Sequence, residues 1–152
     1  MIPMALKSTG RVRFEDVQDH IRNVRRRLDD FSPAADQINA VIDTHIQHQF
    51  DAGGDPKWTP RKRPYPWQIL QKSGRMRRAV SRAAKSARLK LLGRAVVISY
   101  AGIFYATRYT RFHLTSTRFM AARVFSPPQS PLTTDEEAAI VDIVDKHIGL
   151  IP

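Results

Sequence analysis

The spacing of hydrophobic residues changes twice along this chain, and this change limits the fold more than any other feature. Hydrophobic side chains recur every three or four residues near both ends and alternate with polar ones in the middle. The first spacing is typical of amphipathic helices and the second of half-buried strands. We therefore predict an α+β protein in which terminal helices pack on a small antiparallel sheet formed from residues 87–125.

The N-terminal part predicts two helices. A single hydrophobic stripe defines the first helix, over residues 13–29, and consists of Phe14, Val17, Ile21, Val24 and Leu28. Ser32 is expected to cap the second helix, over residues 33–50, with Pro33 at its first position. Because the joint between the two helices is so short, we expect an antiparallel helical hairpin.

Residues 51–72 predict a long irregular loop. Four prolines fall within eleven residues of this stretch, too many for a helix interior or a central strand. Trp58 and Trp67 have two interpretations: they pin the loop to the subunit's own core, or they offer rigid aromatic surfaces to a partner. We predict that the loop reaches a neighbouring subunit, with Trp58, Tyr65 and Trp67 as inter-subunit anchors.

The remaining elements follow the same patterns. A short helix is expected over residues 75–83, and strands over 87–91, 95–100 and 118–125. A helix over 135–147 follows, with Thr134 and Glu137 as a capping box. We expect one domain over residues 13–152 behind a flexible tail over residues 1–12.

Charge is separated along the chain. Residues 56–134 hold 17 of the 25 Lys and Arg and none of the 14 Asp and Glu. A surface of one sign attracts polyanions, and it attracts the acidic parts of neighbouring copies. The candidate residues facing a polyanion or a ring lumen are Arg61, Lys62, Arg63, Arg75, Arg77, Arg78, Arg82, Lys85, Arg88 and Lys90. Arg75, Arg78 and Arg82 share one face of the expected helix.

Several functional classes find no support in the sequence. The chain has no cysteine, so thiolate metal sites and disulfides are excluded. His45 and His48 lie three residues apart on a helix, but no third metal ligand is obvious. No hydrolase or phosphate-loop motif occurs. We therefore expect no catalytic residue, no cofactor, no metal and no membrane segment.

An ordered series of short motifs resembles the Mu-like phage virion morphogenesis family, also called the tail completion family. The series consists of Phe50 to Gly54, Trp58-Thr59-Pro60, Ile69-Leu70 with Ser73-Gly74, Tyr105-Ala106, and Arg123-Val124-Phe125 before a closing helix. Met76 stands where the family has leucine, Ala121 where it has proline, and His113 lies later than the family's histidine. The resemblance covers about residues 14–148.

This resemblance implies a structural protein of a phage neck or tail end, assembled in the host cytoplasm and present in the virion. It implies a homo-oligomeric ring, six-fold, that contacts other neck and tail proteins and passes DNA through its lumen without reading sequence. A stand-alone basic nucleic-acid-binding protein without sequence specificity is the alternative. An enzyme acting on nucleic acid is a third reading, and it would need clustered carboxylates that the middle of the chain lacks.

Overall fold

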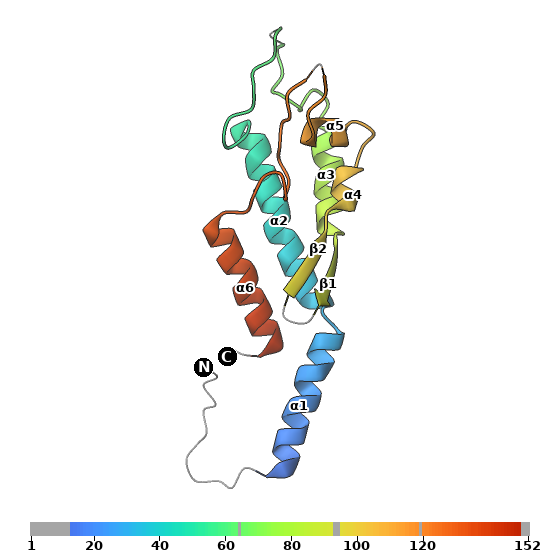
Figure 1. Cartoon of the computed structure of the whole chain (residues 1–152), viewed down its shortest axis with the longest axis vertical. Helices are drawn as coiled ribbons and strands as arrows, with labels where there is room; N and C mark the ends of the chain where they lie inside the picture. The colour runs from blue at the N-terminus through green and yellow to red at the C-terminus, as the bar shows by residue number, and fades with distance from the viewer. Residues whose placement is uncertain (1–12, 64, 93–94, 119, 150–152) are drawn as a thin grey trace.

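A computed structural model of the chain describes residues 13–63, 65–92, 95–118 and 120–149 (Figure 1). The elements in chain order are α1 (Phe14–Asp29), α2 (Ser32–Ala52), α3 (Arg75–Lys85), β1 (Arg88–Leu92), β2 (Ala95–Ser99), α4 (Ala101–Phe104), α5 (Thr110–Leu114) and α6 (Thr134–Ile148). The predicted mixture of helices with a small antiparallel sheet is confirmed. The predicted tail 1–12 lies outside the described residues.

Helix α2 is the centre of the molecule. Ile38, Ile42, Ile46 and Phe50 recur every four residues on one face, and all four are fully buried. Helix α3 packs against α2, as does α6 (Figure 1). Ser32 does not cap α2 as predicted, because the cap position is Phe31. A left-handed Gly53 ends the helix, with a φ of 67°.

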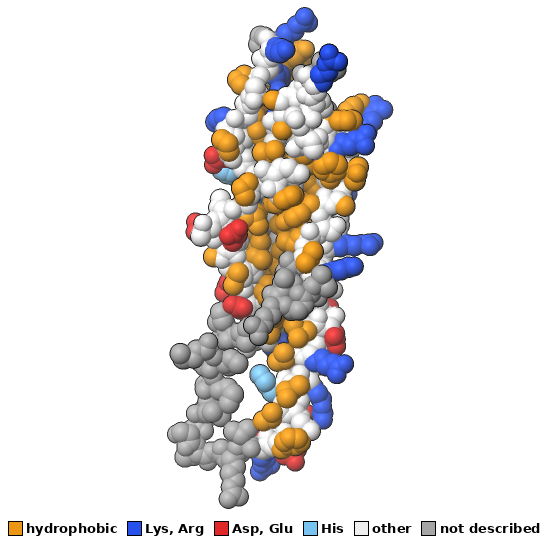
Figure 2. All heavy atoms as spheres, viewed as in Figure 1, with side chains coloured by type: hydrophobic (Ala, Val, Ile, Leu, Met, Phe, Trp, Pro, Cys, Tyr) orange, Lys and Arg blue, Asp and Glu red, His pale blue; other side chains and the backbone are white. Residues whose placement is uncertain are grey.

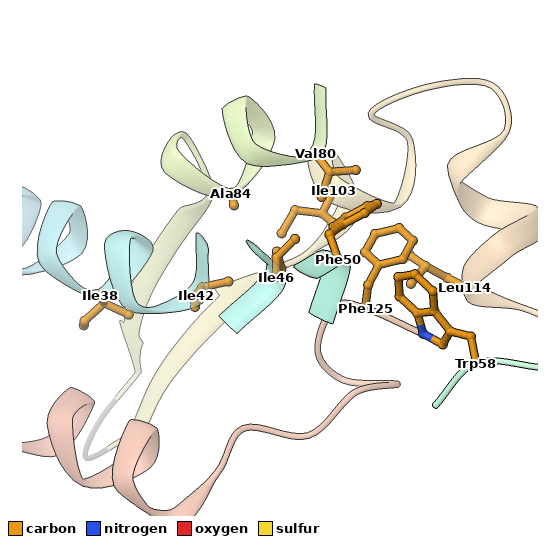
Figure 3. Close-up of a cluster of buried hydrophobic side chains, with 10 residues drawn as sticks. All are labelled: Ile38, Ile42, Ile46, Phe50, Trp58, Val80, Ala84, Ile103, Leu114 and Phe125. Atoms are coloured by element: carbon orange, nitrogen blue, oxygen red, sulfur yellow. The ribbon is translucent and has the colours of Figure 1, made fainter. Parts of the chain in front are cut away.

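The hydrophobic core joins segments that are distant in sequence. Figure 3 shows its side chains: Ile38, Ile42, Ile46, Phe50, Trp58, Val80, Ala84, Ile103, Leu114 and Phe125. The Phe50 ring lies 4.9 Å from the Phe125 ring and 5.8 Å from the Trp58 ring. The start of the proline-rich loop is therefore held in the core by an aromatic cluster.

The predicted helical hairpin does not form. Helix α1 extends away from the end of α2 instead of folding back along it (Figure 1). It contacts the C-terminal end of α6, where His147 Nε2 lies 2.7 Å from the Arg27 carbonyl oxygen. The physical reason is that α3, α6 and the core segments already cover the apolar face of α2.

The sheet is smaller than predicted. Strands β1 and β2 form one antiparallel hairpin in which Lys90 pairs with Val97. The predicted third strand, 118–125, is not part of this sheet. Its backbone groups are used elsewhere: Arg123 N–H donates to the His113 carbonyl at 2.7 Å, and the Val124 carbonyl accepts from Trp58 Nε1 at 2.8 Å.

Helix α6 begins one residue earlier than predicted. Its capping box joins Thr133 to Glu136, whereas the sequence suggested Thr134 and Glu137. The helix ends at Gly149, which is left-handed and whose N–H donates to the carbonyls of Asp145 and Lys146. Residues 101–114, whose spacing shows no clear period, form the short helices α4 and α5.

Candidate functional site

A pocket of about 320 Å³ lies between the end of the proline-rich loop and the segment after α4. The residues that line it are Arg61, Tyr65, Trp67, Ile69, Leu70, Lys72, Ser73, Met76, Tyr109, His113 and Arg123. All of them belong to the stretch 56–134, in which the sequence has no Asp or Glu. The pocket therefore combines positive charge with aromatic and apolar walls.

Arg123 is the most constrained charged group of this pocket. Its side chain is only 9 % exposed, although arginine is seldom buried without a partner. One terminal nitrogen donates to the Thr59 carbonyl at 3.4 Å, whereas Nε has no hydrogen-bond partner among the described residues. Burial, and next the nearby Arg61, lower the pKa of the Arg123 guanidinium. The positive charge is thus under-compensated inside the subunit.

Arg61 organises the aromatic wall of the pocket. The Tyr65 and Trp67 rings are stacked, with centroids 4.9 Å apart and an interplanar angle of 18°. The Arg61 guanidinium lies 5.4 Å from the Tyr65 centroid and 5.9 Å from the Trp67 centroid, and it donates to the Trp67 carbonyl at 3.0 Å. Lys72 Nζ lies 5.0 Å from the Trp67 centroid. Cations and aromatic faces therefore alternate in this part of the loop.

His113 adds a neutral polar atom to the same pocket. Its Nδ1 is buried without a hydrogen-bond partner among the described residues. Burial lowers the pKa of His113 from its usual 6.5, and the charge of Arg123 lowers it further. The imidazole is therefore uncharged at neutral pH. Such a ring can donate or accept one hydrogen bond from a ligand, according to its tautomer.

The backbone that forms one wall is strained at a single position. Leu70 has a φ of 65°, in the left-handed region that leucine rarely adopts. The neighbouring Gln71 holds the loop in place by donating from Nε2 to the Phe50 carbonyl at 2.8 Å. Strain of this kind persists where surrounding contacts fix it, and it is common beside binding sites.

The basic residues predicted to face a polyanion divide into two groups. Those exposed on the surface are Lys62, Arg63, Arg75, Arg78, Arg82, Lys85, Arg88 and Lys90. Arg75, Arg78 and Arg82 lie on the outer side of α3, and the buried Val80 and Ala84 lie on its inner side. Basic side chains gather around the end of the molecule remote from α1 and along the edge away from α6 (Figure 2).

Arg77 differs from the exposed residues of this set because it has several partners within the subunit. Its guanidinium pairs with Asp51 at 2.7 Å and donates to Gln47 at 2.5 Å and to Gln71 at 3.2 Å. The hydrogen bond between Asp51 and Arg77 lowers the pKa of the Asp51 carboxyl. Arg77 therefore connects α2, α3 and the loop within the subunit, and part of its charge is balanced by Asp51.

Trp58 is a correction to the predicted anchors. It was predicted as an inter-subunit anchor, but its side chain is 6 % exposed and belongs to the hydrophobic core. Burial against Phe50 and Phe125 leaves no indole surface for a partner. Tyr65 differs, because it is 52 % exposed, and Trp67 is half-buried beneath it. These two aromatic residues remain candidate anchors.

Sequence analysis missed Arg123, His113 and Tyr109 as site residues. Arg123 lies in the segment predicted as a strand, and the pattern places no special demand on it. One signal was present: Arg123 is a charged residue within the run Ala121 to Phe125, which is otherwise hydrophobic. A charge in such a run is typical of either an edge strand or a functional position.

A second polar cluster lies inside the molecule, away from the pocket. His45 is 3 % exposed, with Nδ1 2.8 Å from Glu136 Oε2 and Nε2 3.0 Å from Ser130 Oγ. This arrangement resembles the order of a serine, histidine and carboxylate in hydrolases. However, Ser130 is only 2 % exposed, and the Glu136 carboxylate also accepts the Thr133 N–H at 2.8 Å. The cluster therefore joins α2 to the start of α6, with no access for a substrate.

The described ranges contain neither a metal cluster nor a membrane-spanning helix. Among these residues, no three His, Asp or Glu side chains are grouped as a metal site requires. None of the described helices is both long enough and apolar enough to cross a membrane. Comparison of the chain with family models, with curated proteins and with solved structures gave no match.

Proposed function

We propose that this chain is a structural, non-catalytic subunit of a tailed phage, located at the neck or the tail end of the virion. The ordered motifs from Phe50 to Phe125, which resemble those of the Mu-like phage virion morphogenesis family, support this proposal. In this proposal, copies of the chain form a ring that completes the tail and joins it to the head. The basic surface lies toward DNA that passes through the ring or toward an acidic neck protein.

Helix α1 carries the proposal. Phe14 is 73 % exposed, Ile21 is 59 % exposed and Val17 is 41 % exposed, so its hydrophobic stripe lies open along one side. An isolated helix of 16 residues is only marginally stable in water. A stripe with strict spacings of three and four is typical of a seam between two paired helices. Helix α1 therefore has the properties of an arm that binds another chain.

We commit to a second copy of this chain as the partner, because α6 is complementary to α1. Val141 is 57 % exposed on the outer side of α6, and Ala138 is exposed beside it. Acidic residues accompany this seam: Asp135, Glu137, Asp142 and Asp145. The second half of α1 carries Arg22, Arg25, Arg26 and Arg27. The hydrophobic residues and the charges of α1 are thus complementary to those of α6, a different helix of the same chain.

An antiparallel pairing brings the central part of both matches into one register, with Val17 as the exception because it falls opposite Asp145. With Ile21 opposite Val141 of the second copy, Val24 falls opposite Ala138 and Arg25 falls opposite Glu137. The two helices have similar lengths, 16 and 15 residues, each about 23 Å long. Because α1 of one copy binds α6 of the next, the contact joins two different surfaces. Such a contact repeats from copy to copy and generates a ring when the rotation closes.

Engineered cysteines test this assembly, since the natural chain has none. One preparation carries Ile21→Cys and a second, of different mass, carries Val141→Cys. After mixing under oxidising conditions, we expect disulfide-linked pairs that contain one chain of each kind. Asn23→Cys is the matched control, because position 23 lies on the opposite side of α1 and should not link. Light scattering measures the mass of the assembly.

The outcomes separate the parts of the proposal. A ring without the cross-link would refute the pairing of α1 with α6 but leave the ring in place. A chain that stays monomeric at all concentrations yet binds nucleic acid would refute the ring and favour the stand-alone binding protein. Label on this subunit should appear at the neck or tail end in images of virions, and label elsewhere would contradict the proposed location.

A further inference from the structure

The pocket beside the aromatic stack lacks an internal counter-ion. Arg61, Lys72 and Arg123 all line it, and no carboxylate is among the described residues around it. Like charges brought together in a partly buried space repel, and a buried guanidinium without full hydrogen bonding is costly. Arg123 Nε and His113 Nδ1 are both buried and unpartnered among the described residues. A bound anion would compensate the charges of Arg61, Lys72 and Arg123.

The walls of the pocket restrict which anion fits. The stacked Tyr65 and Trp67 rings form one wall, Tyr109 is 53 % exposed at the rim, and Leu70 and Met76 supply apolar surface. Flat aromatic walls beside guanidinium groups suit a nucleobase attached to a phosphate. An acidic peptide would use the charges but would leave the flat aromatic wall without a matching group.

The size of the pocket sets the extent of the ligand. Its volume, about 320 Å³, lies at the lower end of the range for small-molecule sites. A space of this size admits one nucleotide, whereas a paired duplex is far wider. The nucleotide must therefore belong to a single strand or to the end of a strand.

We propose that this pocket binds one nucleotide unit of a DNA strand, with the phosphate toward Arg61, Lys72 and Arg123 and the base against the Tyr65–Trp67 wall. The inference deepens the proposed function, on which it rests for the source of the DNA. Because stacking accepts every base, the site discriminates strand from duplex more than one base from another.

Titration with an oligothymidylate of eight nucleotides tests the site, and the signal is the change in tryptophan fluorescence, which comes from Trp67 at the pocket and from Trp58 in the core. Lys72→Gln removes one cation from the pocket, and Lys90→Gln removes the same charge from the exposed edge of β1. We expect Lys72→Gln to raise the dissociation constant about tenfold, the scale of one charged hydrogen bond. Lys90→Gln should change it less than about twofold. Both side chains are exposed, so both variants should fold.

Two smaller probes separate the phosphate contact from the stacking contact. Thymidine monophosphate should bind more tightly than inorganic phosphate to the natural chain. Trp67→Leu, followed by calorimetry because the fluorescence signal is lost, should remove most of that difference. An equal affinity for both probes would overturn the assignment of a nucleotide to the pocket.

Two further results would overturn the proposal. Equal weakening by Lys72→Gln and Lys90→Gln would mean that binding is spread over the basic surface. Tighter binding of a hexaglutamate peptide than of the oligothymidylate would assign the pocket to an acidic protein. These titrations are independent of the cross-linking experiment, since light scattering reports assembly separately. Failure of the nucleotide site would therefore leave the proposed ring standing, and failure of the ring would leave the nucleotide site testable.

Discussion

Helices α1 and α2 have similar hydrophobic patterns but opposite environments. In α2, Ile38, Ile42 and Ile46 are fully buried. In α1, Phe14 and Ile21 are more than half exposed, and no residue of this helix is buried against the rest of the described chain. The spacing of hydrophobic residues thus predicts the helix and its hydrophobic face. It does not predict which surface that face packs against. For α2 the partner is the subunit itself, and for α1 we infer another copy.

The largest expected effect tests the buried half of this comparison. Phe50→Ala removes a fully buried ring at the centre of the aromatic cluster. We expect it to lower the free energy of unfolding by about 3–5 kcal/mol, the usual loss for a core phenylalanine. The measurement is urea denaturation followed by far-UV circular dichroism.

Phe14→Ala is the matched variant in α1. It should change the same free energy by less than about 0.5 kcal/mol in dilute, dissociated protein, since the ring is 73 % exposed. Similar losses for the two variants would show that α1 packs on its own subunit in solution, and the comparison would fail.

A buried polar position of α2 gives the next effect. His45→Ala removes both contacts of the imidazole, with Glu136 and with Ser130. We expect a loss of about 2–3 kcal/mol, because the buried Ser130 hydroxyl and the partly exposed Glu136 carboxylate lose a partner and a cavity remains. The exposed His20 of α1 is the control, and His20→Ala should change stability by only a few tenths of a kcal/mol. If His45→Ala left the free energy of unfolding unchanged, water would replace the ring without cost, and the prediction would be wrong.

The exposed stripe of α1 predicts an effect on assembly with little effect on folding. Ile21→Asp places a charge in the seam proposed to bind α6 of the second copy. The dissociation constant of the assembly should rise about 10- to 100-fold, as for a central interface residue. Sedimentation velocity over a dilution series measures it, and the total helix content measured by circular dichroism should fall by no more than the 16 residues of α1. Unaltered assembly would show that this stripe is not an interface.

The smallest effect concerns the pH dependence of stability through His113. Its folded pKa lies below the usual 6.5, so the unfolded chain takes up this proton first as the pH falls. The stabilisation from a neutral His113 is therefore complete above about pH 6.5 and decreases as the pH drops through that value. The charged groups that line the same pocket as this ring are Arg61, Lys72 and Arg123.

Denaturation between pH 7.5 and 5.5 measures this decrease. His113→Gln should make the dependence flatter, and His20→Gln on α1 should leave it unchanged. A flatter profile for both variants would point to a general charge effect, and bound oligothymidylate should reduce the decrease by placing an anion beside the ring.

The local elements were largely predictable because their signals are local. Proline density identified the loop over residues 51–72, and the hydrophobic residues that recur every four positions in α2 are the ones on its buried face. The helix over 75–83 was found with its exposed arginines in the right order. What failed was pairing between elements. The strand over 118–125 has suitable residues, but its Val124 carbonyl is taken by the Trp58 indole instead of a neighbouring strand.

The candidate site was only partly predictable, for a related reason. Composition identified the basic and aromatic loop that supplies Arg61, Tyr65 and Trp67. It could not show that Arg123, more than fifty residues later, lies against this loop, because that contact depends on how the chain turns after α5. Arg77 shows the opposite case. The sequence does not distinguish it from the other arginines of α3, yet its side chain forms an ion pair with Asp51 of α2.

The turn after α2 imposes a joint constraint on how this protein can evolve. Gly54 has a φ of 92°, and a Cβ atom added there would lie 2.5 Å from Cδ1 of the Trp58 ring. Any side chain at position 54 would displace the indole, and with it the contact to the Val124 carbonyl. Descendants of this chain that keep the fold should therefore inherit Gly54 and Trp58 together. A lineage that replaces Gly54 must also move or replace Trp58, and rebuild the aromatic cluster in the same step.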